Sequence, residues 1–281
     1  MDKRNIMYIT ISIICVISII LGVYYQIFAD KVVNENDVNE IENTVGDTDA
    51  DNPNDLIDEF NALFNNSFNA QGYPTNQITK IAGLEHKAII YPHYDIEKEE
   101  EGKYSMDIEL PVFNVAGDIP AQFNSITQSV FANKASTILT TGTKYTIYNV
   151  EYVAYLNESI LSLVIKATLK EGNSAQRTIV QAYNYDILSK TKVTLDDVLE
   201  DREINKKDVN KKIDVQVKEA ARQAQLISEA TGQVVYKRDL SNAMYLTENV
   251  TNFFLGEDGQ IYIIYAYGNN NITSEIDIIK L

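Results

Sequence analysis

The side chains that could do chemistry in this chain are spaced in ways that indicate no catalytic or metal site. His86 and His93 are the only histidines, and they stand seven residues apart around an expected strand, so they would point to opposite faces. No nucleophile elbow, Walker loop, dinucleotide-binding glycine pattern or HExxH zinc motif occurs. Cys15 is the only cysteine and lies in an apolar run. We therefore predict no catalytic residue, no cofactor, no metal ligand and no enzymatic activity.

Carboxylates are abundant, and their number is what prevents the choice of a catalytic pair. The chain has 40 Asp and Glu side chains, so close pairs arise by chance. Asp186, Asp196 and Asp197 are the least arbitrary candidates, but each also has a structural interpretation as a turn or helix-cap residue. An uncharacterised envelope hydrolase that uses Asp and Glu therefore stays open as the alternative, and a pocket that gathers such residues beside tyrosines would favour it.

Tyrosine is the most unusual part of the composition, with 18 residues and no tryptophan. Many of these tyrosines fall on expected strands, where the ring packs and the hydroxyl reaches water. Tyr183, Tyr185, Tyr265 and Tyr267 are our candidates for a partner-binding surface. Packing in the core and across strands is the competing interpretation of the same residues, and the sequence does not separate the two.

Net charge limits the classes of partner. The chain carries 24 Lys and Arg against 40 Asp and Glu, a net charge of −16. Nucleic acid, which requires basic patches, is therefore excluded, and docking on anionic lipid is disfavoured. An acidic protein attracts cations, including basic proteins, although solubility alone also explains such a charge.

The stretch 6–28 is uncharged and apolar, and it predicts a transmembrane helix. About 20 apolar residues cross a hydrocarbon core of roughly 30 Å. Lys3 and Arg4 precede the stretch and acidic residues follow it, so residues 1–5 are expected to form a cytoplasmic tail and the rest to lie outside the cell. The run is longer than the apolar region of a signal peptide, which favours a retained single-pass anchor.

Residues 29–53 are polar and acidic without apolar periodicity, and they predict a disordered linker. Beyond it, 54–281 is expected to be an extracytoplasmic α+β domain, divisible into 54–190 and 191–281. Strands joined by short polar turns predict an antiparallel meander with helices packed on it. Helices are expected near 56–68, from Pro120 onward and over 206–229, and strands over 86–94, 104–112, 144–155, 159–170, 176–187, 250–255, 260–267 and 275–280.

Five segments carry a resemblance to a known family: LPVFN at 110–114, AQFNSI at 121–126, YTIYNVEYVAYLNESILSLVI at 145–165, AYNYDILSKTKVTLDDVL at 182–199 and FFLGEDGQIYIIYAYG at 253–268. In this order they resemble the RsiV-like / PdaC-like extracytoplasmic domain family of bacterial envelopes. Members form the outer half of a lysozyme-sensing anti-sigma factor and the N-terminal part of a peptidoglycan deacetylase. The resemblance implies the fold, an envelope location and a binding or sensor-like role, with peptidoglycan or a cationic protein such as lysozyme as the expected partner.

Two departures restrict what the resemblance implies. The expected cytoplasmic tail of five residues is too short for a sigma-factor-binding segment, and no deacetylase domain with its metal ligands occurs. Neither sigma-factor control nor deacetylation is therefore expected of this chain.

Overall fold

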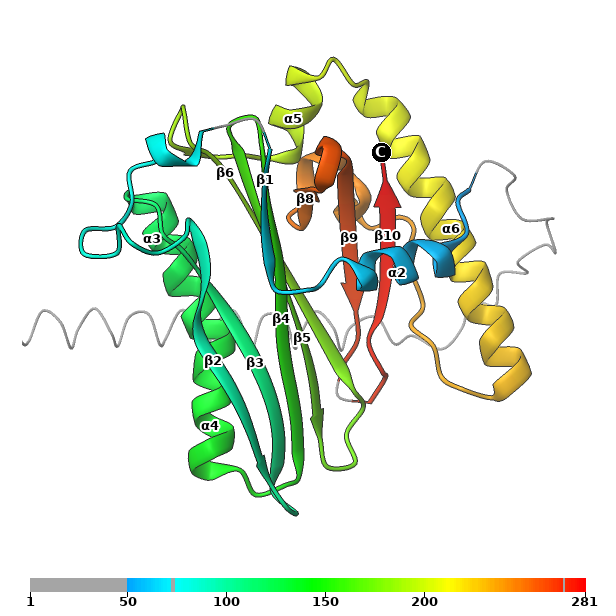
Figure 1. Cartoon of the computed structure of the whole chain (residues 1–281). Coiled ribbons are helices and arrows are strands. Elements are labelled where there is room, and N and C mark those ends of the chain that lie inside the picture. The colour runs from blue at the N-terminus through cyan, green and yellow to red at the C-terminus, as the bar shows by residue number, and fades with distance from the viewer. Residues whose placement is uncertain (1–49, 72–73, 270) are drawn as a thin grey trace, which may run out of the picture. The chain divides into compact units, whose positions relative to one another are not determined.

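The computed structural model describes residues 50–71, 74–269 and 271–281 (Figure 1). The predicted tail 1–5, the predicted span 6–28 and all but the end of the predicted linker 29–53 lie outside these residues. Within the described ranges, no helix combines the length and the apolar character that crossing a membrane requires.

The larger of two sheets, sheet A, has seven strands. The order is β2-β3-β4-β5-β6-β7, and β1 pairs with the second half of β4. The strands are β1 (Ser67–Gln71), β2 (Ile90–Glu100), β3 (Tyr104–Phe113), β4 (Thr146–Asn157), β5 (Ile160–Glu171), β6 (Arg177–Asp186) and β7 (Thr191–Lys192).

Sheet A is mixed, which corrects the predicted all-antiparallel meander. The strands β4, β5 and β6 do form an antiparallel meander, as the short turns between them predict. However, β3 runs parallel to β4, and so does β1. The reason is the connection from β3 to β4, which contains α3 (Asp118–Thr127), a π-helical turn (Gln128–Ala132) and α4 (Asn133–Thr141). A helical crossover of this length returns the chain to the same end of the sheet and allows parallel pairing.

The helices α3 and α4 cover one face of sheet A. Alternate residues of the strands, among them Met106, Ile108, Tyr152 and Leu163, are buried with Phe131 of the π-helical turn. The Tyr148 hydroxyl donates a hydrogen bond to the Phe131 carbonyl oxygen at 3.2 Å. Strand periodicity therefore determines which residues form this core.

Sheet B is a three-stranded antiparallel sheet of β8 (Phe253–Leu255), β9 (Ile261–Tyr267) and β10 (Glu275–Lys280) in the order β10-β9-β8. One of its faces packs against sheet A and α2 (Pro53–Ala62), with Val153, Val164, Phe60 and Phe254 in a shared core. The other face is covered by α5 (Leu195–Asp201) and α6 (Lys206–Thr231). The described residues thus form successive layers of α3–α4, sheet A, sheet B with α2, and α5–α6 (Figure 1).

Local signals explain where the last helices begin and end. Thr194 and Asp197 form a capping box at the start of α5. The Asn205 side chain accepts from the Lys207 amide at the start of α6, and Gly232 ends α6 in the left-handed conformation (φ 70°). Short 3-10 turns occur at Thr75–Gln77, Ala243–Tyr245, Thr247–Asn249 and Glu257–Gly259.

Candidate functional site

The four tyrosines chosen from the sequence as partner-binding candidates lie in hydrophobic cores. Tyr183 and Tyr185, 7% and 2% exposed, pack beneath α3 and α4. Tyr265 and Tyr267, 4% and 6% exposed, lie between sheet B and α6. None of the four presents its ring to the surface. Burial raises the pKa of each hydroxyl above its ordinary value of 10.0.

Tyr267 belongs to a buried polar cluster on the face of sheet B that α5 and α6 cover. Its hydroxyl lies 2.9 Å from the Tyr245 hydroxyl. The Arg238 guanidinium lies 5.0 Å from the centre of the Tyr267 ring and forms two hydrogen bonds with Asp277, at 2.8 and 2.7 Å. A further hydrogen bond of 2.7 Å joins Arg238 to Glu275. Because its charged groups are paired with one another and largely buried, this cluster does not offer a surface for a partner.

The candidate carboxylates have local structural partners. Asp186 accepts hydrogen bonds from the Leu188 and Ser189 amides in the turn after β6, at 3.0 and 3.3 Å. Asp197 accepts from Thr194, whose hydroxyl and amide lower the pKa of the carboxyl group. Asp196 forms an ion pair with Lys206 at 2.9 Å. These residues lie at a turn and in a helix cap, as their structural interpretation expects.

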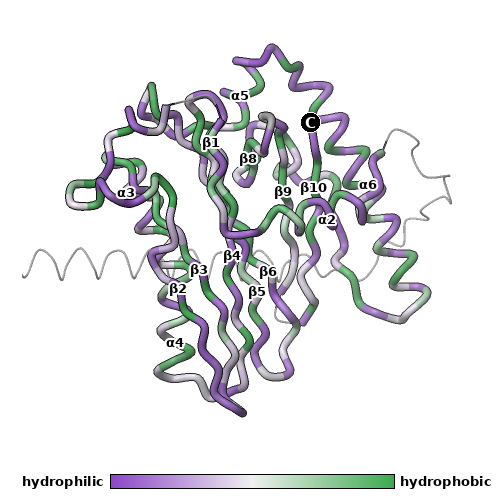
Figure 2. Tube along the Cα trace, viewed as in Figure 1, coloured by the Kyte–Doolittle hydropathy of each residue, from purple (hydrophilic) through white to green (hydrophobic). Residues whose placement is uncertain are grey.

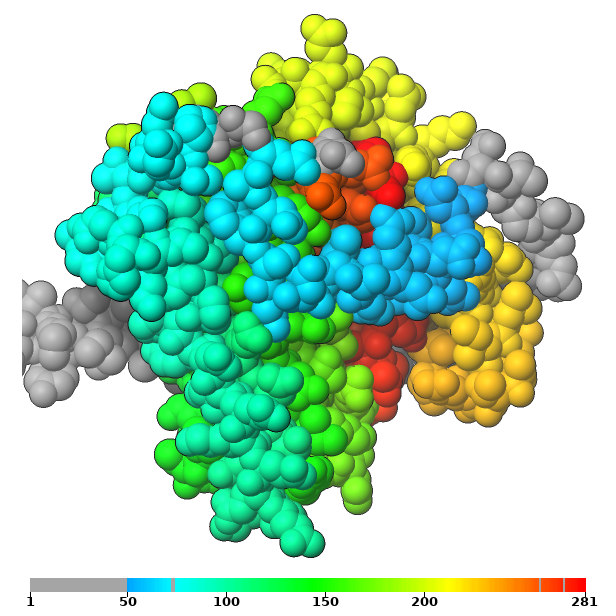
Figure 3. All heavy atoms as spheres, in the orientation of Figure 1, coloured from blue at the N-terminus to red at the C-terminus, as the bar shows by residue number. Residues whose placement is uncertain are grey.

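A different set of carboxylates lies together on the other face of sheet A. In β3, Met106, Ile108 and Leu110 point toward α3 and α4, so Asp107 and Glu109 point away from these helices. Asp107 is exposed and Glu109 is half-buried. Toward the β2–β3 turn, this face of the sheet is not covered by sheet B or α2, and in Figure 3 no other element lies in front of the lower parts of β2 and β3.

The register between β2 and β3 brings more carboxylates to the same face. Asp95 lies directly opposite Glu109, and Glu97 lies directly opposite Asp107. Glu99 follows two residues after Glu97 and points the same way. We call these five residues, Asp95, Glu97, Glu99, Asp107 and Glu109, the acidic face. Figure 2 shows that the β2–β3 hairpin continues into a hydrophilic tip.

The acidic face lacks compensating charge. Within the described part of the chain, none of its five carboxylates forms an ion pair. Lys166, on the same face of β5, pairs instead with Glu151 at 2.8 Å and also donates to Asn61 of α2 at 3.0 Å. Burial and the nearby Glu109 charge raise the pKa of the Tyr152 hydroxyl to about 12.

Folding alone does not explain this arrangement. Like charges directly opposite each other on neighbouring strands are destabilising, on the scale of roughly 0.2–1 kcal/mol per cross-strand pair. Charge on an edge strand can prevent strand-to-strand aggregation, and β2 is an edge strand. That role does not account for Asp107 and Glu109, because β3 lies inside the sheet between β2 and β4. The acidic face is therefore suited to receive ammonium and guanidinium groups from a partner.

The hydrolase alternative expects carboxylates gathered in a pocket. Two hollows of the described residues bear on this expectation. One is lined by Lys144, Tyr145, Gly172, Asn173, Ser174, Ala175 and Asn271 and contains no carboxylate, and the other, between α6 and residues 240–246, contains only Asp214. No group of His, Cys, Asp and Glu in the described ranges could hold a metal ion. Neither of these two hollows gathers the Asp and Glu side chains that the hydrolase alternative expects.

Sequence reasoning missed the acidic face although half of its signal is present. The strict alternation of Tyr104, Met106, Ile108, Leu110 and Val112 predicts a strand with one buried side, which β3 confirms. The alternation also implies that Asp107 and Glu109 share the other side. What the sequence lacks is the register of β2, which pairs like charges across the hairpin.

No protein-family model and no curated protein matches the chain. Among the solved structures that are similar to it at low identity are two members of one family. One is a DUF3298 family protein from Pseudomonas aeruginosa PAO1, with 12% identity, a TM-score of 0.36, and coverage of 67% of this chain and 86% of that chain. The other is a member of the same family from Bacteroides fragilis NCTC 9343, with 12% identity, a TM-score of 0.34, and coverage of 63% and 80%. Both are described by a family name that specifies no activity.

Proposed function

We propose that this chain is a single-pass, membrane-anchored binding domain of the bacterial cell envelope, and that its acidic face binds a cationic protein such as lysozyme. The acidic face carries the proposal, because its opposed carboxylates cost stability and lack ion-pair partners within the described residues. A partner that places lysines or arginines beside Glu97 and Asp107 would offset the repulsion between these carboxylates and form favourable ion pairs with them.

The charge of the whole chain supports the proposal through the rate of association. A net charge of −16 attracts a cationic protein at long range, and such steering raises association rates by roughly 10- to 1,000-fold at low salt. Steering decays over a Debye length of about 8 Å at physiological ionic strength. Attraction therefore brings the partner in, and the local arrangement of the acidic face orients it.

The location in the envelope rests on the sequence. The apolar stretch 6–28 and the resemblance to the RsiV-like / PdaC-like family support an anchored domain outside the cell. Peptidoglycan, the other partner expected from the sequence, carries carboxylates of its own and would be repelled by the acidic face. Binding of peptidoglycan would therefore require a different surface.

Retention of lysozyme by the immobilised full-length chain in detergent micelles tests the proposal. We expect retention in low salt that weakens as the salt concentration rises. Isolated cell-wall sacculi, offered in a parallel experiment, test the second expected partner. Failure of the chain to retain lysozyme or another cationic protein of similar size, such as cytochrome c, at low salt would refute the binding role of the acidic face.

A further inference from the structure

A groove at the end of sheet A brings together three segments that are distant in the sequence. Its walls come from the two residues before β4, the turn between β5 and β6, and Asn271, which precedes β10. The cavity measures about 760 Å³ and is lined by Lys144, Tyr145, Gly172, Asn173, Ser174, Ala175 and Asn271. This volume lies within the range of roughly 300–1,000 Å³ that small-molecule sites occupy.

Backbone hydrogen bonds hold the walls in place. The Gly172 amide donates to the Tyr145 carbonyl oxygen at 2.8 Å, and the Ser274 amide donates to the Gln176 carbonyl oxygen at 2.9 Å. Gly172 has a φ of +53°, and a Cβ atom there would lie 3.5 Å from the Lys144 side chain. The turn and the lysine stem therefore pack closely, and the groove is built before any ligand enters.

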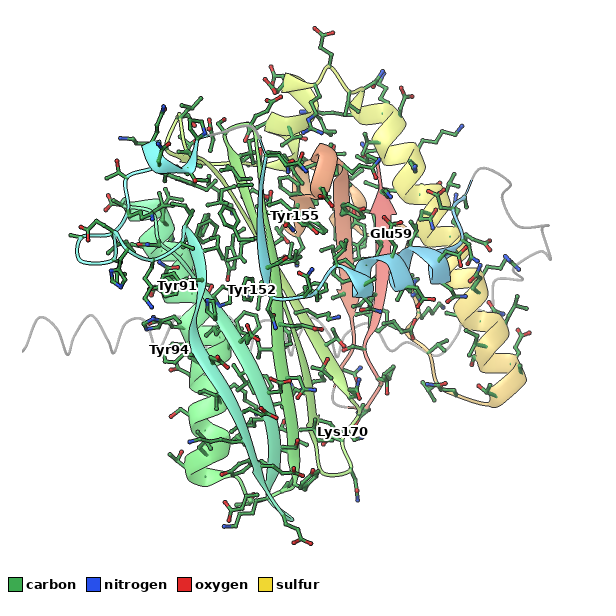
Figure 4. All side chains as sticks on the ribbon, viewed as in Figure 1. Glu59, Tyr91, Tyr94, Tyr152, Tyr155 and Lys170 are labelled. Atoms are coloured by element: carbon green, nitrogen blue, oxygen red, sulfur yellow. The ribbon has the colours of Figure 1, made fainter. Side chains whose placement is uncertain are left out.

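The groove lies among basic side chains in an otherwise acidic protein. Lys134 and Arg177 each contact Glu171, at 2.7 and 2.8 Å, and the pKa of that carboxyl group is lowered mainly by the hydrogen bond from Lys134. Lys170 donates to the Ser174 carbonyl oxygen near the lower end of β5 (Figure 4). Lys144 is exposed and forms no ion pair within the described residues. The lining of the groove therefore carries one positive charge, that of Lys144, and no carboxylate.

The lining indicates the class of ligand. Tyr145 is 41% exposed and offers an aromatic surface on which the C–H face of a sugar ring can stack. The Asn173 and Asn271 amides can each donate to and accept from hydroxyl groups, and the Ser174 hydroxyl can do the same. Lys144 supplies a positive charge for an anionic substituent. Most of these side chains are polar and do not suit an apolar ligand. Together they suit a hydroxyl-rich ligand that carries negative charge.

We propose that this groove binds an oligosaccharide that carries carboxylate groups. The Tyr145 ring stacks on one sugar, the two asparagine amides bond its hydroxyls, and the Lys144 ammonium pairs with a carboxylate. The site shares no residue with the acidic face, so it does not depend on the proposed binding of a cationic protein.

The absence of tryptophan from the chain makes a direct test possible. Tyr145→Trp keeps an aromatic ring in the groove and introduces the only indole, so its fluorescence reports ligands at this position. The full-length Y145W chain in detergent would be titrated with trigalacturonic acid, with the neutral trisaccharide chitotriose and with inorganic phosphate. We expect saturable binding of the acidic trisaccharide, at least about tenfold tighter than that of chitotriose, and no saturation by phosphate in the same range.

Two further variants make the result specific. Adding Lys144→Gln to Y145W should weaken binding of the acidic trisaccharide about fivefold or more and leave the affinity for chitotriose unchanged. Adding Glu97→Gln and Asp107→Asn should change neither titration, which separates this site from the acidic face. Calorimetric titration of the wild-type chain with the same ligands checks that binding does not depend on the introduced indole. Equal affinity for the two trisaccharides, tighter binding of phosphate, or no binding in either assay would overturn the proposal.

Discussion

The two faces of sheet A are built from alternate residues of the same strands, yet they differ in almost every physical respect. Toward α3 and α4, residues such as Ile108 and Leu163 are 1% exposed and form one continuous core. On the opposite face near the β2–β3 turn, Glu97 and Asp107 are exposed and stand against each other. The first face stabilises the fold. On the second face the opposed like charges disfavour folding, as the proposed binding role expects of residues that serve a partner.

Sheet B sharpens the comparison, because charged residues occur there on a covered face. Asp277 is 2% exposed and pairs with Arg238 through two hydrogen bonds. Buried charges are tolerated when they are paired and hydrogen-bonded. The carboxylates of the acidic face have no such partners in the described residues. The comparison of these faces yields four expectations for the stability of the fold.

Removing one charge of the buried pair should have the largest effect. Asp277→Asn leaves the Arg238 guanidinium without its main partner, and such a change costs about 3–5 kcal/mol of unfolding free energy. Urea unfolding followed by circular dichroism measures the loss. A double variant, Arg238→Met with Asp277→Leu, should recover part of it because both fully buried charges are then absent, while Glu275, whose side chain is 22% exposed, keeps the hydrogen bond from the Tyr236 amide. A loss below about 1 kcal/mol in the single variant would show that water reaches the pair.

Truncation on the covered face of sheet A should come next. Ile108→Ala removes buried methyl groups beneath α3 and is expected to cost about 2–5 kcal/mol. Asn149→Ala, at an exposed position of β4 on the opposite face, should change stability by less than about 0.5 kcal/mol. Equal costs for the two variants, measured by urea unfolding, would mean that another layer covers both faces.

A paired carboxylate at the surface should give a pH-dependent contribution. The pKa of Glu59 on α2 is lowered from its ordinary value of 4.5, mainly by hydrogen bonds from Lys280 and Tyr262 of sheet B. Figure 4 shows Glu59 on α2 beside this sheet. Its stabilisation is therefore present above pH 4.5 and is lost as the pH falls through the lowered pKa. Glu59→Gln should be less stable than wild type at pH 7, by less than about 1 kcal/mol because the group is partly exposed.

The comparison that checks Glu59 is the difference in unfolding free energy between wild type and Glu59→Gln, followed from pH 7 to pH 3. We expect the difference to shrink as the pH falls. A difference that stays constant or grows toward low pH would contradict the role of the Glu59 charge.

Relief of like-charge repulsion should have the smallest effect and the opposite sign. Asp107→Asn removes the charge opposite Glu97 and should raise stability by about 0.2–1 kcal/mol at low salt. The gain should shrink in high salt, because screening weakens the repulsion in the wild type. A loss of stability at low salt would indicate that Asp107 has a favourable partner.

The sequence predicts the parts of the fold that depend on nearby residues. The turns at 157–158 and 171–173 predict the meander of β4, β5 and β6, and the pattern over 206–229 predicts most of α6. The parallel pairing of β3 with β4 could not be predicted in this way, because it depends on where the helices of the crossover pack. The boundaries of some elements also differ from the prediction. The strand expected over 86–94 begins at Ile90 and ends at Glu100.

The candidate sites were less accessible to prediction than the fold. Alternation places Tyr183 and Tyr265 on strands, but whether a strand face is covered depends on layers formed by distant segments. The acidic face needs the register of Asp95 with Glu109, and the groove needs Tyr145, Asn173 and Asn271 to meet. Each of these depends on tertiary contacts, which carry no local signal in the sequence.

The central claim is that the position of charge on the acidic face, and not the net charge of the chain, determines binding of a cationic protein. The most direct test measures the dissociation constant for lysozyme with two variants of equal net charge. One carries Glu97→Gln and Asp107→Asn, and the control carries Glu229→Gln and Asp201→Asn at exposed positions outside the acidic face. We expect the first to raise the dissociation constant roughly tenfold or more and the control to change it less than about twofold. Equal weakening by both variants would contradict the claim.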